Sequence, residues 1–375
     1  MERLKSSDTY VCTTKKGGIL NTAFFSSVTK SVVLLLLMAA TVAVFDVEAS
    51  APGVYFIADG FAYSESKSIK SITDSNWNVE LQPGDISFSV DRVEAGVSLG
   101  RWQLGYIKRY DYYFEYSPET ADGVHKVKNK TPLVPGEQFD LYLAANTMVS
   151  DGLRITFNQE YSKSFSYGVS VSYLRGELFN DGSLNGQAEV ITDKEYEFSF
   201  DVDYFYSEDK LFDREVDPPQ GRGYAVDLVF DWKLSNKLKF GFQAYDILTR
   251  MYWENAPRTI ATASSDTKEF DEDGYVIYNP VVSGLETNQD YMQEIPRKIF
   301  LSADYSIGRY VFDMVFRDYE IKSFYLVGAG LNINDNSKIG LSCNLTASAC
   351  GVDYSNHWFR FKLITDDLKL EDALA

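Results

Sequence analysis

Apolar and polar residues alternate over segments of roughly ten residues along most of this chain, and the apolar positions are rich in aromatic side chains. From Tyr196 to Tyr206 the even positions are apolar or aromatic, whereas Glu197, Asp201 and Asp203 occupy odd positions. Successive side chains of a β-strand point to opposite faces, so each such segment separates an apolar phase from a wet one. The pattern therefore predicts an all-β fold with two-faced strands.

The N-terminal region has the layout of a secretory signal peptide. An apolar run at residues 32–45 follows Lys30 and other lysines, and at about 14 residues it is short for a spanning helix, which needs about 20. Small residues before the expected cut predict a signal peptide over 1–49, cleaved after Ala49. Cleavage after Ala51 and an uncleaved signal anchor are the alternatives.

Charge and composition narrow the partners. The formal net charge is −18, and aromatic residues make up 15% of the chain. Without residues 1–49, which carry five basic and four acidic side chains, 31 basic and 50 acidic side chains remain, a balance of −19. Such acidity excludes nucleic acid as a partner. The acidity of the chain has two equally good explanations: acidic loops that stay soluble in a salty habitat, or a functional role of the carboxylates.

Fourteen strands are predicted, with twelve to sixteen left open because residues 176–194 form an unusually long connection. They are 53–63, 86–98, 101–115, 137–148, 153–161, 165–175, 195–206, 222–234, 237–248, 298–306, 309–317, 322–334, 337–345 and 356–366. The even connections, such as the one at residues 150–152, are short and of turn composition, and five of the odd ones are long. A lipid-facing strand needs lateral pairing, and only closure removes the sheet edges, so we expect an antiparallel transmembrane β-barrel with long extracellular loops over residues 50–366. A soluble β-sandwich is the alternative.

The pattern resembles the Gram-negative outer-membrane β-barrel proteins as a class, over nearly the whole mature length, and no motif assigns a particular family. Such proteins usually end on a strand whose last residue is Phe or Trp. This chain instead runs on through 367–375, so we expect a short C-terminal tail, on the periplasmic side, unless the signal is internal. The resemblance implies an outer-membrane location and contact with outer-membrane lipid and small solutes.

Side chains at lumen-facing positions are the candidate selectivity residues. They are Glu197, Asp201, Asp203, Asp227, Asp231, Asp304 and Asp313, opposed by Arg154, Lys233 and Arg317. Because carboxylates predominate and rings of carboxylates favour cations, we expect a cation-preferring lumen. The alternative is a salt-bridged network that fills the barrel and leaves no pore.

Other chemistry has little support. Cys343 and Cys350 are the two cysteines left after signal cleavage, and we expect them to form a local disulfide in an oxidising compartment. Acidic residues at 269–273 are spaced like the start of a calcium loop, but the position of the closing Glu is Pro280, so no metal site is predicted. His125 and His357 have no triad geometry in the sequence, so we expect neither an enzyme nor a cofactor.

These observations favour an outer-membrane channel or transporter for small solutes, with residues 249–297 as a loop that constricts or caps the lumen. The alternative function is a non-conducting barrel that serves as a docking or assembly platform for envelope or surface components. The sequence leaves the solute and the oligomeric state undetermined.

Overall fold

The computed structural model describes residues 53–374 with several gaps, so the predicted signal peptide lies outside the described residues. The gaps are residues 74–79, 194, 210, 213, 266–267, 271–275, 279–280, 335, 357–358 and 368–372.

The first half of the described chain contains β1 (Gly53–Ser64), α2 (Ile69–Thr73), β2 (Ile86–Leu99), β3 (Trp102–Tyr116), α3 (Pro118–Asn129), β4 (Gln138–Ser162), β5 (Phe165–Val190) and β6 (Tyr196–Tyr206). The second half contains β7 (Gln220–Lys233), β8 (Leu238–Ser264), β9 (Lys268–Phe270), β10 (Val276–Tyr278), β11 (Val281–Glu294), β12 (Lys298–Ile307), β13 (Tyr310–Asp318), β14 (Ser323–Asn334), β15 (Ser337–Asn344), β16 (Ala349–Ser355) and β17 (Arg360–Thr365). No described helix is long and apolar enough to span a bilayer.

Fifteen of these strands form one antiparallel sheet, and β9 and β10 form a separate hairpin. Two pairs of strands lie end to end: β6 and β7 both pair with β5, and β11 and β12 both pair with β8. Counting each pair once, thirteen strands (fifteen minus two) stand side by side in the sheet. The predicted all-β, antiparallel fold class is confirmed.

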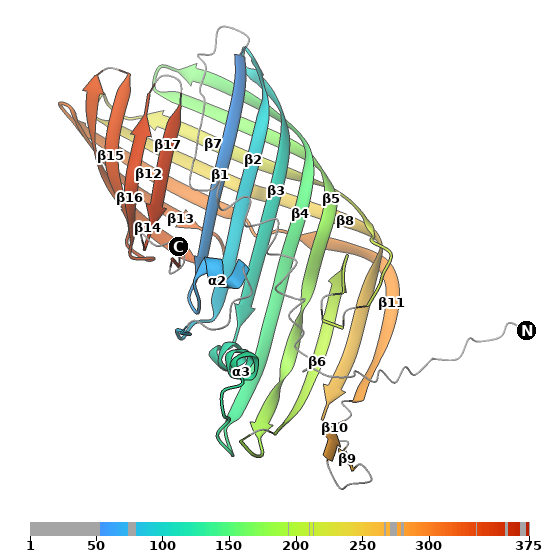
Figure 1. The fold of residues 1–375 in the computed structure, drawn as a ribbon. Coiled ribbons are helices and arrows are strands. Elements are labelled where there is room, and N and C mark those ends of the chain that lie inside the picture. Colours follow the sequence, from blue (N-terminus) through green and yellow to red (C-terminus); the bar gives the residue numbers. More distant parts are fainter. Residues whose placement is uncertain are drawn as a thin grey trace, which may run out of the picture.

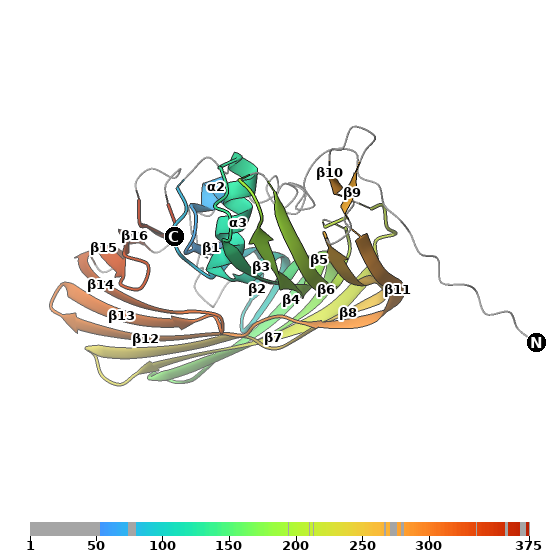
Figure 2. The same cartoon turned by 90° about the horizontal axis from the view of Figure 1, so that it is seen from below.

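The sheet curls round so that its last strands turn back towards β1 (Figures 1 and 2), and we call this curled sheet the barrel. Side chains from both ends of the sheet meet inside it, since the rings of Phe61 on β1 and Phe324 on β14 have centroids 4.9 Å apart. With thirteen strands, each antiparallel to the next, β1 and β17 run in the same direction. The described residues show no backbone pairing between these two strands.

One predicted turn is wrong. Residues 150–152 lie inside β4, which runs unbroken from Gln138 to Ser162 and pairs with β3 and β5 on its two sides. Turn chemistry at Asp151-Gly152 is outweighed because β3 continues past this point and supplies a ladder partner for each residue. A one-residue irregularity between Val149 and Ser150 against β5 absorbs the local mismatch.

Three predicted connections also contain strands. The 176–194 stretch is mostly the second half of β5, and 346–355 includes β16. The 249–297 segment is not one long loop, because its described parts extend β8 to Ser264 and return as β11. Strands β8 and β11 lengthen the wall, and the β9–β10 hairpin between them is a separate two-stranded sheet beyond the end of the wall (Figure 1).

The additional strand β16 moves the C-terminal tail to the opposite end from the one predicted. Ser64 at the end of β1 donates its backbone N–H to the carbonyl of Leu374, and Ile69 donates to Ala373. The tail therefore lies at the end of the barrel that carries the long connections, which we call the long-loop end. The other end, with the tight connections at 100–101, 163–164 and 308–309, is the short-turn end.

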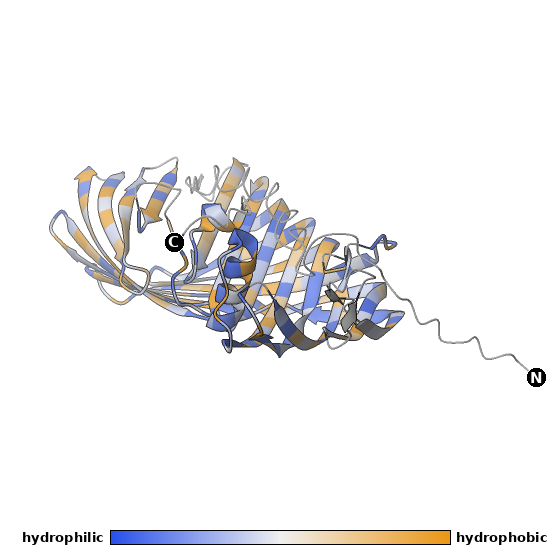
Figure 3. Ribbon diagram, turned by 60° about the horizontal axis from the view of Figure 1, so that its bottom comes forward, coloured by the Kyte–Doolittle hydropathy of each residue, from blue (hydrophilic) through white to orange (hydrophobic). Residues whose placement is uncertain are grey.

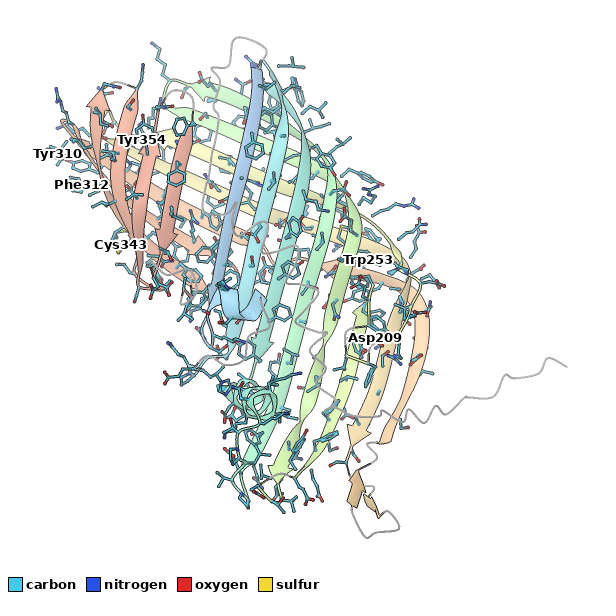
Figure 4. All side chains as sticks on the ribbon, in the orientation of Figure 1. Asp209, Trp253, Tyr310, Phe312, Cys343 and Tyr354 are labelled. Atoms are coloured by element: carbon cyan, nitrogen blue, oxygen red, sulfur yellow. A yellow bond between two sulfur atoms is a disulfide. The ribbon has the colours of Figure 1, made fainter. Side chains whose placement is uncertain are left out.

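An apolar belt surrounds the outside of the barrel. Its large side chains are between 47% (Phe312) and 64% (Leu341) exposed, and Tyr310 and Phe312 project outward from β13 (Figure 4). Other members are Leu104, Tyr106, Leu153, Ile155, Val171, Tyr173, Trp232, Met314 and Tyr325. Figure 3 shows the alternation of hydrophobic and hydrophilic residues along the strands. Exposed apolar surface of this extent is rare on soluble monomers and marks a surface covered by lipid or protein.

A band of paired charges limits the belt towards the long-loop end. Lys108 on β3 pairs with Glu177 on β5, and Arg175 on β5 lies 3.0 Å from Asp151 on β4. Two further pairs, Arg222–Glu254 and Arg250–Glu294, continue the band over β7, β8 and β11, each at 3.5 Å. Charges on an outward face fit a membrane–water boundary and not the hydrocarbon interior.

Beyond this band the sheet continues as an extension made of β6, β11 and the far halves of β4, β5 and β8 (Figure 1). Here the face that is continuous with the apolar belt is buried by protein: Phe200, Val202, Tyr204 and Tyr206 on β6 are 2–7% exposed. Partly buried Leu211 and Phe212 from the 207–219 connection pack against them. The aromatic face of β6 is thus a protein core and does not face lipid.

Candidate functional site: an ionic layer inside the barrel

Charged side chains from opposite walls meet inside the barrel. Arg109 on β3 donates two hydrogen bonds to Asp246 on β8, at 2.7 and 2.8 Å, and two to Asp111, at 3.1 and 3.2 Å. Lys298 on β12 donates to Asp246 at 2.5 Å and to Asp111 at 3.2 Å. Each of these four side chains is at least 92% buried. Two positive charges therefore face two negative ones in the interior.

A second group continues this arrangement towards β1. Arg154 on β4 pairs with Asp227 on β7, and its Nε lies 3.6 Å from Glu94 on β2. Tyr55 on β1 donates its hydroxyl to Glu94 at 2.7 Å. Asp227 also accepts the backbone N–H of Asp246 at 2.8 Å, which links the two groups. We call Glu94, Arg109, Asp111, Arg154, Asp227, Asp246 and Lys298 together the ionic layer.

Local backbone geometry places Asp246 in this layer. The β7–β8 pairing shifts register between Val226 and Leu228, and Asp246 lies in the opposing irregular part of β8 with a φ of 57°. Asp tolerates this left-handed conformation better than most residues because its short polar side chain can bond locally. Here Thr249 donates its hydroxyl to Asp246 at 2.8 Å. The bulge turns the carboxylate into the barrel instead of along the strand.

Aromatic side chains fill the barrel on the long-loop side of the ionic layer. Phe61 on β1 stacks on Tyr319 at 5.1 Å, and Phe88 on β2 lies 5.2 Å from the same ring. Nearby, Trp253 on β8 stacks on Phe179 of β5 at 4.1 Å (Figure 4). Gly221 on the intervening β7 makes room for that indole, since a Cβ there would lie 2.4 Å from it.

The space left between these groups is small. A cavity of about 50 Å³ is lined by side chains of the ionic layer together with Asp59, Arg92 and Tyr245. Because a water molecule takes up about 30 Å³ in the liquid, a cavity of this size holds at most a few waters. The ionic layer therefore leaves little free space between its own side chains.

The sequence-predicted lumen residues separate into three groups. Arg154 and Asp227 belong to the ionic layer. Glu197, Asp201 and Asp203 lie on β6 in the extension, where Asp203 pairs with Arg258 at 2.7 Å and Asp201 accepts a hydrogen bond from Thr262. The remaining residues, Asp231, Lys233, Asp304, Asp313 and Arg317, lie on β7, β12 and β13.

Two of the residues in the third group have close partners. Asp313 lies directly opposite Asp304 in the β12–β13 ladder and 3.6 Å from Lys338 on β15. The guanidinium carbon of Arg317 lies 5.2 Å from the centre of the Phe300 ring and belongs to the interior. The structure therefore does not bring the predicted carboxylates together into one ring.

Sequence reasoning missed five residues of the ionic layer: Glu94, Arg109, Asp111, Asp246 and Lys298. Arg109 and Asp111 occupy odd, inward positions of a strand that was predicted, so the alternation itself contains the signal. Asp246 had no such signal, because its orientation depends on the bulge in β8.

The predicted cysteine pair lies on neighbouring strands. Cys343 on β15 is the ladder partner of Cys350 on β16, and their sulfur atoms form a disulfide in the structure (Cys343 is labelled in Figure 4). In the part of the chain that the structure describes, no group of three or more His, Cys, Asp or Glu side chains is arranged to hold a metal ion.

No protein-family model and no curated protein matches this chain. Among solved structures, the Ralstonia pickettii toluene transporter TbuX is 11% identical, covers 86% of this chain and 78% of its own, and has a TM-score of 0.34. The Pseudomonas putida toluene transporter TodX is 8% identical, with 86% and 79% covered and a TM-score of 0.36. The ferric yersiniabactin uptake receptor FyuA from Yersinia pestis is 10% identical, with 81% and 49% covered and a TM-score of 0.20.

These three are outer-membrane β-barrel proteins, the class that the sequence pattern resembles. Likenesses at such TM-scores carry no argument about a family, a solute or a mechanism.

Proposed function

We propose that this chain is an outer-membrane β-barrel of a Gram-negative bacterium that passes small solutes, and that its lumen is closed in this conformation by the ionic layer. The apolar belt would face lipid, and the band of paired charges would lie at the outer membrane surface. The short-turn end would then face the periplasm, as short connections do in barrels of this class. The extension would stand in the extracellular medium.

The observation that carries this proposal is the meeting of buried charges from opposite walls at the level of the lipid-facing strands. Arg109 and Asp246 are separated by three strands in the wall, yet they form a two-pronged ion pair. Charged side chains at membrane depth are costly and usually mark a solute or ion pathway. A mutually neutralised cluster can close such a pathway and can open when its pairs separate.

The proposal includes the cation preference predicted from the sequence but not the predicted closure by a loop. A cation preference would arise from Asp231, Asp304 and Asp313 in the periplasmic half of the lumen. Lys338 lies near Asp313, and Lys239 and Arg360 lie near the other two carboxylates and would limit this preference. Closure by a loop at 249–297 is not proposed, because β8 and β11 belong to the wall and the β9–β10 hairpin lies beyond its end. The absence of enzymatic activity stays a prediction.

A docking platform is the second candidate function, and two observations favour it. Side chains of opposite walls bond to each other in the ionic layer. The extension ends in β11, a 14-residue strand that pairs with β8 alone among the described residues. An edge strand of this length can take up a strand from an envelope or surface protein.

Charge-changing variants of the ionic layer separate the two functions. We would record single-channel currents in planar bilayers under a salt gradient for Arg109→Gln, Asp246→Asn and the matched control Arg258→Gln, which alters an ion pair in the extension. Only protein that migrates as a folded, heat-modifiable barrel would be compared.

The two lumen variants should shift the reversal potential in opposite directions. Arg109→Gln should shift the reversal potential towards cation selectivity and Asp246→Asn towards anion selectivity, because each variant leaves one charge on the pathway without its partner. Arg258→Gln should leave it unchanged. Folded variants that carry no current, or that shift in the same direction, would contradict the channel and favour the platform.

A further inference from the structure

A second cavity lies outside the barrel interior, on the covered face of the extension. It is lined by residues of α2, α3 and the strands β2 to β6, it is partly open to the outside, and its volume is about 120 Å³. Its apolar wall consists of Ile72, Leu81, Phe114, Ala121, Val124, Leu143, Ala145, Leu184, Val202 and Leu211. None of these residues belongs to the ionic layer.

Most polar groups at this cavity bond to one another, whereas Nδ2 of Asn180 in the cavity wall is buried without a hydrogen-bond partner. The hydroxyl of Tyr116 lies 2.6 Å from that of Ser66 and 2.7 Å from that of Ser87, and Ser87 also contacts Ser64 at 2.8 Å. The Thr120 hydroxyl accepts the backbone N–H of Tyr142 at 2.9 Å. A ligand would therefore meet carbon atoms and few hydrogen-bonding groups that lack a partner.

Two lysines at the cavity indicate surroundings of low polarity. Burial lowers the pKa of Lys67 to about 8, and it also lowers the pKa of Lys128. Burial has this effect because an environment poor in water disfavours the charged ammonium group.

The wall of the cavity is held in place by local hydrogen bonds. Asp209 accepts the hydroxyl of Tyr204 at 2.8 Å and the backbone N–H groups of Leu211 and Phe212 at 3.2 and 3.0 Å, which fixes the 207–219 connection over β6 (Figure 4). On the other side Ser117 caps the start of α3 by accepting the N–H of Thr120. The cavity is thus preformed.

We propose that this cavity is a binding site for a small, uncharged apolar molecule of about the size of benzene. An apolar cavity of about 150 Å³ in a well-packed protein stays dry and binds benzene or xenon. The cavity here is of the same order and has the same kind of lining. The site faces the extracellular side in the proposed topology, but its ligand binding does not depend on passage through the barrel.

Xenon tests the proposal without the ambiguity of a probe that dissolves in detergent and fluoresces there. Crystals of the full chain pressurised with xenon should show anomalous density between α3 and β4. Ala145→Leu on β4 should abolish that density by filling the cavity, and Ala121→Leu on α3 is a second filling variant if the first fails to fold. Ala303→Leu is the matched control, because its side chain lies on the outward face of β12, opposite Met314.

The expected result is xenon in this cavity in the wild type and in Ala303→Leu, with at least a tenfold loss of occupancy in a filling variant. The proposal is overturned if xenon binds elsewhere in the crystal but not here. It is equally overturned if the density persists undiminished in both folded filling variants.

Discussion

The ionic layer predicts a large and specific cost for removing Lys298. This side chain is 4% exposed and is bonded to both Asp246 and Asp111. Replacement by Met keeps a similar length and leaves two buried carboxylates with Arg109 as their nearby cation. Removing one partner of a buried ion pair costs about 3–5 kcal/mol, so we expect Lys298→Met to lower the free energy of unfolding by that amount.

A second substitution should recover much of this loss. In Lys298→Met/Asp246→Asn one cation again faces one carboxylate, so the double variant should be more stable than Lys298→Met alone. The coupling free energy from the double-mutant cycle should exceed about 1 kcal/mol, because the two residues touch. Arg258→Met is the control: its pair with Asp203 is partly exposed and should cost at most about 1 kcal/mol.

Urea unfolding in lipid vesicles, followed by tryptophan fluorescence and by the gel shift of the folded barrel, measures these differences. If Lys298→Met costs no more than Arg258→Met, the ionic layer is not a buried, mutually neutralised cluster. The same holds if Asp246→Asn and Lys298→Met add independently.

Three further predictions concern other parts of the molecule. Leu341→Arg, on the apolar belt, should destabilise the folded barrel in a bilayer by about 2–4 kcal/mol, whereas Leu285→Arg on the extension should be close to neutral; equal effects in urea titrations would argue against the belt. Burial raises the pKa of Asp181 to about 6, above its ordinary value of 3.8, so the free energy of unfolding should fall as pH rises from about 4 to about 6. Asp181→Asn should remove up to about 3 kcal/mol of that fall, and unfolding at pH 4 and at pH 8 checks this. Cys343→Ser should cost about 2–3 kcal/mol through loss of the link to Cys350; free thiols on both residues in peptides from unreduced protein would contradict the disulfide.

Alternation predicted the strands well because it reports the two faces of a strand directly. Strands such as β3, β7 and β13 begin and end within one or two residues of the predicted bounds. Alternation does not report what covers the apolar face. The even positions of β6 look like a lipid-facing surface, but the 207–219 connection folds over them and makes them a core.

Features that depend on a neighbouring strand could not be predicted in the same way. The sequence at residues 150–152 has turn chemistry, but β3 and β5 supply partners that keep β4 extended. The extension arises because β8 and β11 pair beyond the point where β12 begins.

The interior shows the same limit. Inward charges were predicted as a class, and Arg154 and Asp227 were among them, but their mutual neutralisation depends on distances between opposite walls. A bulge in β8 places Asp246 in the site, and no local sequence motif predicts that bulge.

Spin labels that report the surrounding medium test the account most directly. The full chain in lipid nanodiscs would carry a label at Leu153 or Leu341 on the belt, or at Asn185 on the exposed face of the extension. We expect oxygen, which concentrates in lipid, to relax the belt labels and a water-soluble nickel chelate to relax the label at Asn185. Belt labels that respond to the chelate as strongly as the label at Asn185 would contradict a membrane-spanning barrel.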